Sequence, residues 1–517
     1  MRAQVSEKRP VFGDDPVTIE DIVAIARGAG ASLTDAPEAR QRIEASARFV
    51  SDLWREEGVI YGVTTGYGDS CTVSVPSHLV EELPLHLTRF HGCGLGRHFD
   101  HAHGRAILAS RLASLSRGYS GVRTELLQRL VDYINRDIVP LIPEEGSVGA
   151  SGDLTPLSYV AAALVGEREV YHQGQIQPVA DVLAREQLQP LQLMPKEGLA
   201  IMNGTAVMTA VACLAYDRAA YLAKLATRLT SLTSVVLKGN AHHFDEKLFS
   251  VKPHPGQGQI AAWIRSDLQS SAVGRNSDRL QDRYSVRCAP HIIGVLQDSL
   301  GWMRQFIEIE LNSANDNPII DGEGEHVLHG GHFYGGHIAF AMDALKVAVA
   351  NIADLVDRQL ALLVDVKFNN GLPANLSGAT PDRAMINHGF KAVQIGASAW
   401  TAEALKHTMP ASVFSRSTEC HNQDKVSMGT IAARDCERVL ELTEQVVAAG
   451  LLATTQALYL RKCDTEFDAS VITPTLESFY SEMRDFFDVV DEDRPLESLL
   501  RQTCSHIRGQ RWSLYHD

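Results

Sequence analysis

Long apolar stretches with few helix-breaking residues dominate the chain, at residues 206–237, 338–367 and 430–462. Each is much longer than an average globular helix, and apolar residues lie on several sides when the stretch is wound at 3.6 residues per turn. A helix that is apolar on several sides is one that is buried. The pattern therefore predicts a large bundle of long, buried helices.

Alternating strand patterns are scarce, and only residues 169–177 and 325–328 have the character of hairpin strands. The uncharged stretch 199–216 is interrupted by Asn203, Gly204 and Thr205. That interruption favours a loop followed by a buried helix over a membrane span. The predicted fold class is mostly α.

The charge balance and the cysteines narrow the function classes. The 517-residue chain has 63 acidic and 48 basic residues, a formal charge of -15, and no run of Lys and Arg, which argues against nucleic acid or an anionic membrane as a partner. The eight cysteines are widely spaced and form no C-x-x-C pair, so they indicate neither zinc nor disulfides. The first residues do not resemble a signal peptide. We expect a cytoplasmic protein.

Polar segments rich in Gly, Asn, Thr and Ser separate the apolar stretches, and each is explained as a turn when taken alone. Long rigid helices that carry such loops suit a site assembled from distant parts of the chain. The segments are residues 61–70, 146–155, 203–205, 312–318, 330–336 and 368–380.

The triplet Ala150, Ser151 and Gly152 can form an electrophile. In a tight bend, the Gly152 nitrogen attacks the Ala150 carbonyl carbon, and loss of water from the ring and from Ser151 leaves a methylene group conjugated to an imidazolone. Gly152 has no Cβ to obstruct the closure. The alternative is an ordinary loop that leads into a helix, with Asp153 as N-cap and Pro156 in the first turn. Both descriptions can hold together.

Six motifs occur in one order: "YGVTTGYG" (61–68), "GSVGASGDLTPLS" (146–158), "EGLAIMNGTAVMT" (197–209), "YSVRCAPHIIG" (284–294), "ELNSANDNP" (310–318) and "HNQDKVSMGTIAAR" (421–434). Together they resemble the histidine, phenylalanine and tyrosine ammonia-lyases, from about residue 17 to about residue 462. The resemblance implies a methylidene-imidazolone cofactor made from Ala150, Ser151 and Gly152, with no metal or dissociable cofactor. It also implies removal of ammonia from an aromatic L-amino acid.

The resemblance further implies a mostly α, histidine ammonia-lyase-like and fumarase/aspartase-like fold. An N-terminal domain, expected at residues 1–220, would hold the cofactor loop. A long-helix bundle with a C-terminal helical region would occupy residues 221–517. The family forms homotetramers in which several subunits contribute to each site.

The motif positions imply roles for individual residues. Tyr61 matches the base that takes the β-proton, and Asn203 matches the amide that holds the cofactor and substrate. Tyr284 also matches a residue of the family site, and Arg287 matches the one that binds the substrate carboxylate, for which a planar guanidinium is well shaped. Further matches to the substrate site are Gly68, Gln281, Asn315 and Phe333, whereas His332 stands where the family commonly has Asn.

The substrate side chain is contacted in this family by a pair of residues, here Phe90 and His91. A His at the second position rewards a para-hydroxyl on the substrate ring and is left unpaired by phenylalanine; the alternative is a core His bonded to backbone. Gln423 is neutral where histidine enzymes have a Glu that pairs with imidazole. Lys425 replaces a commonly aliphatic residue and has no explanation.

These observations rank tyrosine first as substrate, phenylalanine second and histidine third. An aminomutase, which returns ammonia to the β-carbon, uses the same motifs. The alternative from another class is a helical structural protein that has lost the chemistry. The intact Ala150, Ser151 and Gly152, together with Tyr61 and Arg287, favour the enzyme.

Overall fold

The structure is a computed structural model that describes residues 9–56, 58–269 and 280–516. Its elements are predominantly helical, which confirms the predicted class. The contacts within the chain define two compact units. Unit 1 comprises residues 1–217, 303–343 and 410–434, and unit 2 comprises residues 218–302, 344–409 and 435–517. The expected boundary near residue 220 stays a prediction about domains.

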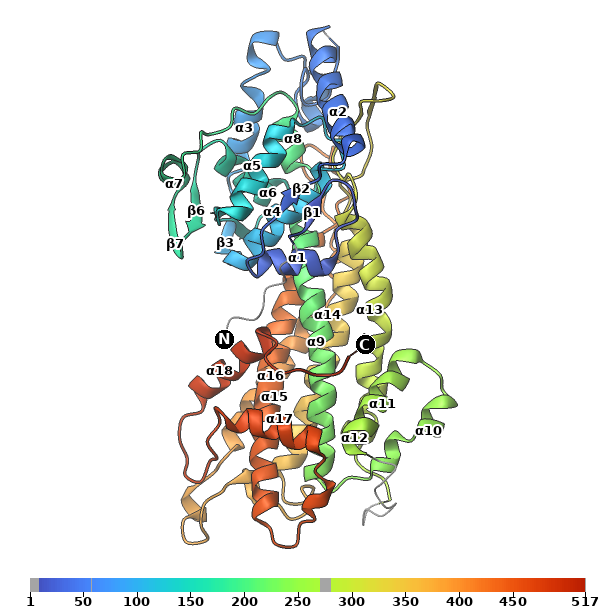
Figure 1. The fold of residues 1–517 in the computed structure, drawn as a ribbon, viewed down its shortest axis with the longest axis vertical. Coiled ribbons are helices and arrows are strands. Elements are labelled where there is room, and N and C mark those ends of the chain that lie inside the picture. The colour runs from blue at the N-terminus through green and yellow to red at the C-terminus, as the bar shows by residue number, and fades with distance from the viewer. Residues whose placement is uncertain (1–8, 57, 270–279, 517) are drawn as a thin grey trace. The chain divides into compact units, whose positions relative to one another are not determined.

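Unit 1 is built from short helices and small sheets (Figure 1). Its helices are α1 (Ile19–Ala26), α2 (Pro37–Arg55), α3 (Leu83–Phe90), α4 (His101–Leu115), α5 (Thr124–Asn135), α6 (Leu154–Leu164), α7 (Val179–Arg185) and α8 (Glu197–Met202). Its strands are β1 (Val11–Phe12), β2 (Ser32–Leu33), β3 (Leu95–His98), β4 (Val139–Pro140), β5 (Pro143–Glu145), β6 (Glu169–His172), β7 (Gln175–Pro178), β8 (Ile319–Asp321) and β9 (His326–Leu328).

The strands of unit 1 pair in small sheets of two or three strands. The predicted hairpin at residues 169–177 is confirmed as the antiparallel pair β6 and β7, and the one at 325–328 is strand β9, which pairs with β8. β3 pairs with β5 in antiparallel fashion. This pairing places the chain that leaves α3 beside the chain that leads into the Ala150–Gly152 loop.

Four long helices contribute residues to both units, because their sequence ranges cross the unit limits. They are α9 (Ala206–Val236), α13 (Ala289–Leu311), α14 (Gly336–Val364) and α16 (Gly429–Cys463). The three long helices predicted from apolar patterning correspond to α9, α14 and α16, with ends within three residues of the expected positions.

Unit 2 contains the remaining helices α10 (Glu246–Ser250), α11 (Pro255–Leu268), α12 (Tyr284–Arg287), α15 (Lys391–Lys406), α17 (Pro474–Arg484) and α18 (Glu497–Arg508). Gly450 of α16 lies where Val356 of α14 and Leu229 of α9 meet, and a Cβ added there would come within 3 Å of both side chains. The absence of a side chain at Gly450 therefore lets three long helices pack closely.

Among the described residues, α9 is the one helix whose length and composition would allow it to cross a membrane. However, 72% of its apolar window is buried inside the protein. Its apolar character is therefore accounted for by packing in the core.

Candidate active site

The loop before α6 has an unusual backbone. Gly149 and Gly152 have φ values of +78° and +79°, and Ser151 between them has a φ of +49°. A left-handed conformation is uncommon for a residue with a side chain and often marks a functional site. Ser151 is half-buried and Gly152 is buried.

Residues 203–205 hold one side of this loop. Gly152 and Gly204 form a parallel bridge, in which the Gly204 N–H donates to the Ser151 carbonyl over 3.1 Å and the Asp153 N–H donates to the Gly204 carbonyl over 2.8 Å. A Cβ added at Gly152 would collide with the Gly204 backbone. Only glycine fits at this position, as the ring-closure chemistry also requires.

The start of α16 holds the opposite side of the loop. The Met428 N–H donates to the Val148 carbonyl over 3.0 Å. Thr430 donates its hydroxyl to Asp153, and Ser147 donates to the same carboxylate over 3.3 Å. The loop is therefore fixed between two segments distant in the sequence.

Asp153 acts differently from the sequence prediction. It stands at the N-cap position of α6, but its side chain makes no cap hydrogen bond to that helix. Its carboxylate instead accepts from the N–H groups of Val207 and Met208 at 3.0 and 2.9 Å. These groups belong to the first turn of α9, whose unpaired donors need acceptors. Asp153 therefore caps α9, a correction that the local pattern could not supply.

Several helix N-termini meet beside the loop. Added Cβ atoms at Gly335 and at Gly429 would both collide with the Met208 sulfur, so the first turns of α9, α14 and α16 meet at Met208. Each N-terminus carries a partial positive charge. Together with the start of α6, these helices provide a field that favours negative charge at the loop.

Asn203 is a buried residue whose side-chain oxygen is a candidate binding group. It is 2% exposed, and among the described residues its Oδ1 atom has no hydrogen-bond partner. A buried unsatisfied acceptor costs free energy, about 1–3 kcal/mol. Its position next to Gly204, which pairs with the loop, makes this oxygen available to a group formed there.

Asn315, by contrast, is already occupied. Its Oδ1 accepts from Arg111 and Ser114 at 3.1 and 3.0 Å, and its Nδ2 donates to Thr205 over 2.7 Å. Thr205 in turn donates to Glu310 over 2.5 Å. This network fixes residues 203–205 from behind, so the geometry supports a positioning role for Asn315.

Buried charges near this network were missed by the sequence analysis. Lys196 and Asp316 form an ion pair of 2.6 Å with no exposed side-chain surface. Burial raises the pKa of Asp153 to about 6, against hydrogen bonds from Thr430 and the α9 backbone. Burial also raises the pKa of Glu310 to about 6. The acidic residues of "ELNSANDNP" were the available signal, but nothing local predicts their burial.

Tyr61 is positioned by its own loop. Its hydroxyl oxygen accepts from the Gly68 N–H over 2.7 Å. Burial raises the pKa of Tyr61, and the Gly68 hydrogen bond opposes that shift by stabilising the anion. Gly68 has a φ of +59°, and Glu419 occupies the space that a Cβ would need. The structure thus brings together the predicted residues Tyr61 and Gly68.

Phe90 and His91 end α3. Phe90 is 59% exposed, and its ring centroid lies 4.2 Å from that of His91. The His91 Nδ1 atom lies 3.1 Å from the carbonyl of Leu87, one turn earlier. Since a carbonyl only accepts, this contact selects the tautomer with the proton on Nδ1 and leaves Nε2 as an acceptor. Burial lowers the pKa of His91, which favours its neutral form.

Gln423 belongs to a tight hairpin in which residues 418 and 423 exchange backbone hydrogen bonds. Its Oε1 atom accepts from the Thr418 hydroxyl at 2.9 Å. Phe333 is half-buried in a turn before α14, whereas His332 and Lys425 are exposed.

Three further predicted residues lie together in unit 2. The Arg287 Nε atom donates to the Asp282 carbonyl over 3.0 Å, and a terminal nitrogen donates to the Gln281 side chain over 3.3 Å. The guanidinium lies 4.7 Å from the centre of the Tyr284 ring. Tyr284 is 72% exposed. The predicted site residues therefore fall into two groups, one in each unit.

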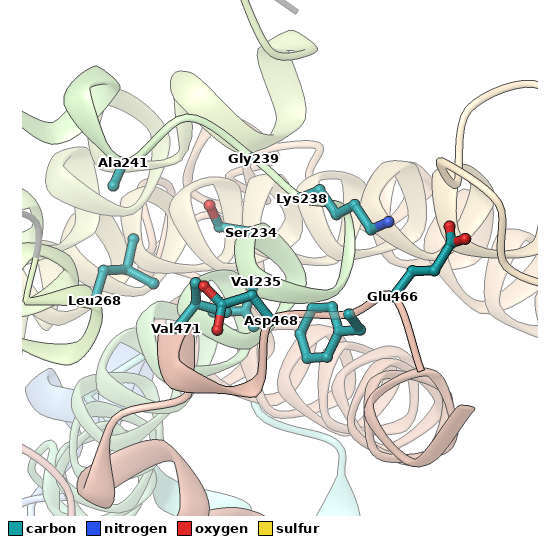
Figure 2. Close-up of a pocket in the computed structure, with 10 residues that line it drawn as sticks. Ser234, Val235, Lys238, Gly239, Ala241, Leu268, Glu466, Asp468 and Val471 are labelled. Atoms are coloured by element: carbon teal, nitrogen blue, oxygen red, sulfur yellow. The ribbon is translucent and has the colours of Figure 1, made fainter. Parts of the chain in front are cut away.

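Unit 2 also contains a hollow with a volume of about 270 Å³. Figure 2 shows Lys238 and Glu466 on one side of it and Ala241 and Leu268 on the other. The remaining lining residues are Ser234, Val235, Gly239, Phe467, Asp468 and Val471. None of these was predicted from the motifs, so the candidate active site is not this hollow.

The residues of unit 1 fit the methylidene-imidazolone group implied by the motifs. Ser151 has a left-handed backbone, Gly152 tolerates no Cβ, and the backbone of Gly204 holds both residues in place. The converging helix N-termini supply the field that an electrophile acquiring negative charge requires.

Known proteins resemble this chain in both sequence and fold. A family model described as aromatic amino acid lyase matches residues 17–485. The chain is 35% identical to a tyrosine ammonia-lyase of Cereibacter sphaeroides over 99% of both chains, and 36% identical to a histidine ammonia-lyase of a Geobacillus species over 92% of both. Its fold matches a tyrosine aminomutase from Streptomyces globisporus with a TM-score of 0.90 and 33% identity, over 98% of this chain and 97% of that one.

Proposed function

This chain belongs to the aromatic amino acid lyase family, and we propose that it converts L-tyrosine to trans-p-coumarate and ammonia with a self-formed methylidene-imidazolone. The cofactor, made from Ala150, Ser151 and Gly152, would supply an electrophile that turns the substrate amine into a better leaving group. No metal takes part in this proposal.

The residues of unit 1 would carry the proton and the charge. Tyr61 would remove the β-proton as its phenolate, which the Gly68 N–H stabilises over 2.7 Å. Asn203 would lie against the cofactor ring and accept a hydrogen bond from the substrate amino group through its Oδ1 atom, which has no partner among the described residues. The N-termini of α6, α9, α14 and α16 would stabilise negative charge at the loop.

The residues of unit 2 would bind the substrate. Arg287 would pair with the substrate carboxylate, and Gln281 and Tyr284, which it contacts, would complete that part of the site. We propose a homotetramer whose sites combine residues of different copies of the chain. Such an arrangement explains why one group of site residues lies in unit 1 and the other in unit 2.

The choice of tyrosine rests on His91. Its Nδ1 atom is committed to the Leu87 carbonyl, so a neutral His91 presents the Nε2 lone pair, which accepts a hydrogen bond from a para-hydroxyl. Phenylalanine offers no donor there, at a cost of about 1–3 kcal/mol. Phe90, Phe333 and Gln423 would line the rest of the substrate pocket, and the neutral Gln423 offers no charge to an imidazole.

The sequence ranked histidine third, but a histidine ammonia-lyase is as similar in sequence as the tyrosine enzyme, which moves histidine to second candidate substrate. Phenylalanine would be favoured if Phe90 dominated the pocket. The likeness to a tyrosine aminomutase keeps amine migration as a further alternative. A catalytically inactive structural protein would not need the conformations of Ser151 and Gly152.

The first test supplies the purified protein with L-tyrosine, L-phenylalanine and L-histidine in parallel and follows product by ultraviolet absorption. We expect coumarate to form at least tenfold faster than cinnamate or urocanate. Faster cinnamate or urocanate would overturn the choice of tyrosine. A β-amino acid product would identify an aminomutase.

A second test concerns the cofactor. We expect the intact mass to lie below the sequence mass by two waters, because ring closure and Ser151 each lose one. An unmodified mass in freshly purified protein would contradict the cofactor and, with it, the lyase. For localisation we propose the cytoplasm, where the eight cysteines would stay reduced.

A further inference from the structure

Arg168, in the turn between α6 and β6, has a backbone conformation that does not suit it. Its φ is +70°, in the left-handed region that favours glycine. An arginine held there costs free energy, so its side chain must contribute something that glycine would not. The side chain is half-buried rather than free in solvent.

The guanidinium of Arg168 connects α3 to α6. One terminal nitrogen donates to the Thr88 carbonyl in the last turn of α3 over 2.8 Å, and the other donates to the Ser158 hydroxyl of α6 over 3.1 Å. It also lies 4.2 Å from the centre of the Tyr159 ring. A Cβ added at Gly92 would collide with it, so the chain after His91 is shaped around this side chain.

These contacts complete the C-terminus of α3. The Leu87 carbonyl meets the His91 ring, the Thr88 carbonyl accepts from Arg168 at 2.8 Å, and the His91 carbonyl accepts from the Cys93 N–H at 2.8 Å. The last carbonyls of a helix have no partners within it and carry partial negative charge. The half-buried cation of Arg168 at this end therefore holds the last turn of the helix, on whose Leu87 carbonyl the His91 ring rests.

We infer that Arg168 is a positioning residue that sets substrate discrimination by fixing His91. Its guanidinium fastens the last turn of α3 to α6, the helix that begins directly after Ala150, Ser151 and Gly152. The distance between the His91 ring and the cofactor loop is thereby fixed. This inference rests on the proposed function and adds the residue on which the selectivity of that site depends.

Arg89 offers a matched control. It pairs with Glu167 over 2.6 Å and so joins the same two segments at the surface, but its side chain is 52% exposed. Exposed ion pairs of this kind contribute little. If selectivity depended only on contact between α3 and the turn after α6, replacing either arginine would change it. If it depends on the position of His91, only replacement of Arg168 changes it.

The experiment uses the full-length protein with Arg168→Gly, Arg168→Lys and Arg89→Ala. Arg168→Gly removes the guanidinium and relieves the backbone, so the fold survives; the two-water mass loss checks the cofactor loop. We expect the ratio of kcat/KM for L-tyrosine to that for L-phenylalanine to fall about tenfold with either Arg168 variant, mainly through L-tyrosine. Arg89→Ala should change the ratio less than about twofold.

Combination with His91→Phe separates the possible outcomes. In that background, the Arg168 variants should change the ratio no further, because their effect passes through His91. An equal fall for both substrates, or a ratio change that persists without His91, would overturn the inference.

Failure of the proposed function has a different signature. If the choice of tyrosine is wrong, the wild-type protein prefers histidine or phenylalanine. The same cycle is then measured on that preferred substrate against L-tyrosine, and independent effects of the two residues would still reject the inference.

Discussion

The loop that carries Ser151 in unit 1 is held by backbone contacts on two sides, whereas in unit 2 the guanidinium of Arg287 contacts the Gln281 side chain, the Tyr284 ring and the Asp282 carbonyl. Gly152 is buried, and Tyr284 is 72% exposed. The first group has a geometry imposed by the surrounding fold. The second presents side chains at a surface of its unit.

The difference corresponds to two tasks. Forming an electrophile from backbone atoms requires a strained and rigid loop, which buried hydrogen bonds and glycine contacts provide. Binding an amino acid requires a guanidinium that can exchange neighbours for a carboxylate. We therefore expect substitutions in the Ser151 loop to affect the cofactor, and substitutions of Gln281, Tyr284 or Arg287 to affect substrate binding alone.

The largest effect is expected for Ser151→Ala. Without the hydroxyl there is no methylene group, so activity should fall about a thousandfold or more while the helical fold remains. Activity assays, mass spectrometry and circular dichroism measure the three properties. Full activity in this variant would remove the basis for the cofactor.

Arg287→Met tests the second group. We expect kcat/KM to fall about a hundredfold, because the carboxylate loses its charged partner, while the mass still shows the loss of two waters. Arg283→Met is the control, since Arg283 packs on the Phe368 ring at 4.6 Å, and it should retain most of its activity. Loss of the cofactor in Arg287→Met would end the distinction between the groups.

Coexpression of the Ser151→Ala chain with the Arg287→Met chain tests whether each site combines residues of different copies. If each site takes Ser151 from one copy and Arg287 from another, random mixing should restore about a quarter of wild-type activity. That is some 25-fold above the Arg287→Met protein. No restoration in mixed oligomers would mean that both groups come from one chain.

The pH dependence concerns Tyr61. Burial raises the pKa of Tyr61 above its usual value, and the phenolate is the active base, so kcat/KM should rise by up to tenfold per pH unit from pH 7 toward alkaline pH. Rate measurements across this range provide the test. A bell-shaped pH profile of kcat/KM centred near neutrality would assign removal of the β-proton to another group.

The smallest effect concerns stability. The pKa of Asp153 is about 6 in the folded protein against 3.8 as its ordinary value, so the folded state binds this proton more tightly. Its contribution is present below pH 3.8 and declines as pH rises through 6. Between pH 5 and 7 the wild type should lose about 1 kcal/mol more unfolding free energy than Asp153→Asn. Urea titrations at pH 5 and pH 7 give the unfolding free energies of both proteins. An equal change in unfolding free energy for wild type and Asp153→Asn would contradict this.

Local patterns predicted the helices and the hairpins well. The periodicity that identifies α9, α14 and α16 is a property of neighbouring residues, because side chains three and four positions apart share a helix face. The alternation in residues 169–177 is equally local. The triplet at residues 150–152 was recognisable because its chemistry depends on three consecutive residues.

The candidate site was predicted less completely. Asp153 was expected to serve the helix that follows it, but its carboxylate caps α9, 54 residues away. Lys196 and Asp316 pair over 120 residues. The role of Arg168 has no local signal, because an arginine does not predict a left-handed φ. Each of these depends on which segments the fold brings together.

The sequence by itself determined the helices, the loops between them and the residues able to form an electrophile, since these follow from short-range sterics and covalent chemistry. Only the tertiary structure decided which helix each carboxylate caps, which charges are buried, and that the starts of four helices meet beside the loop. These outcomes depend on long-range packing. The free energy of these buried charges and hydrogen bonds depends on distant segments that together exclude water from them.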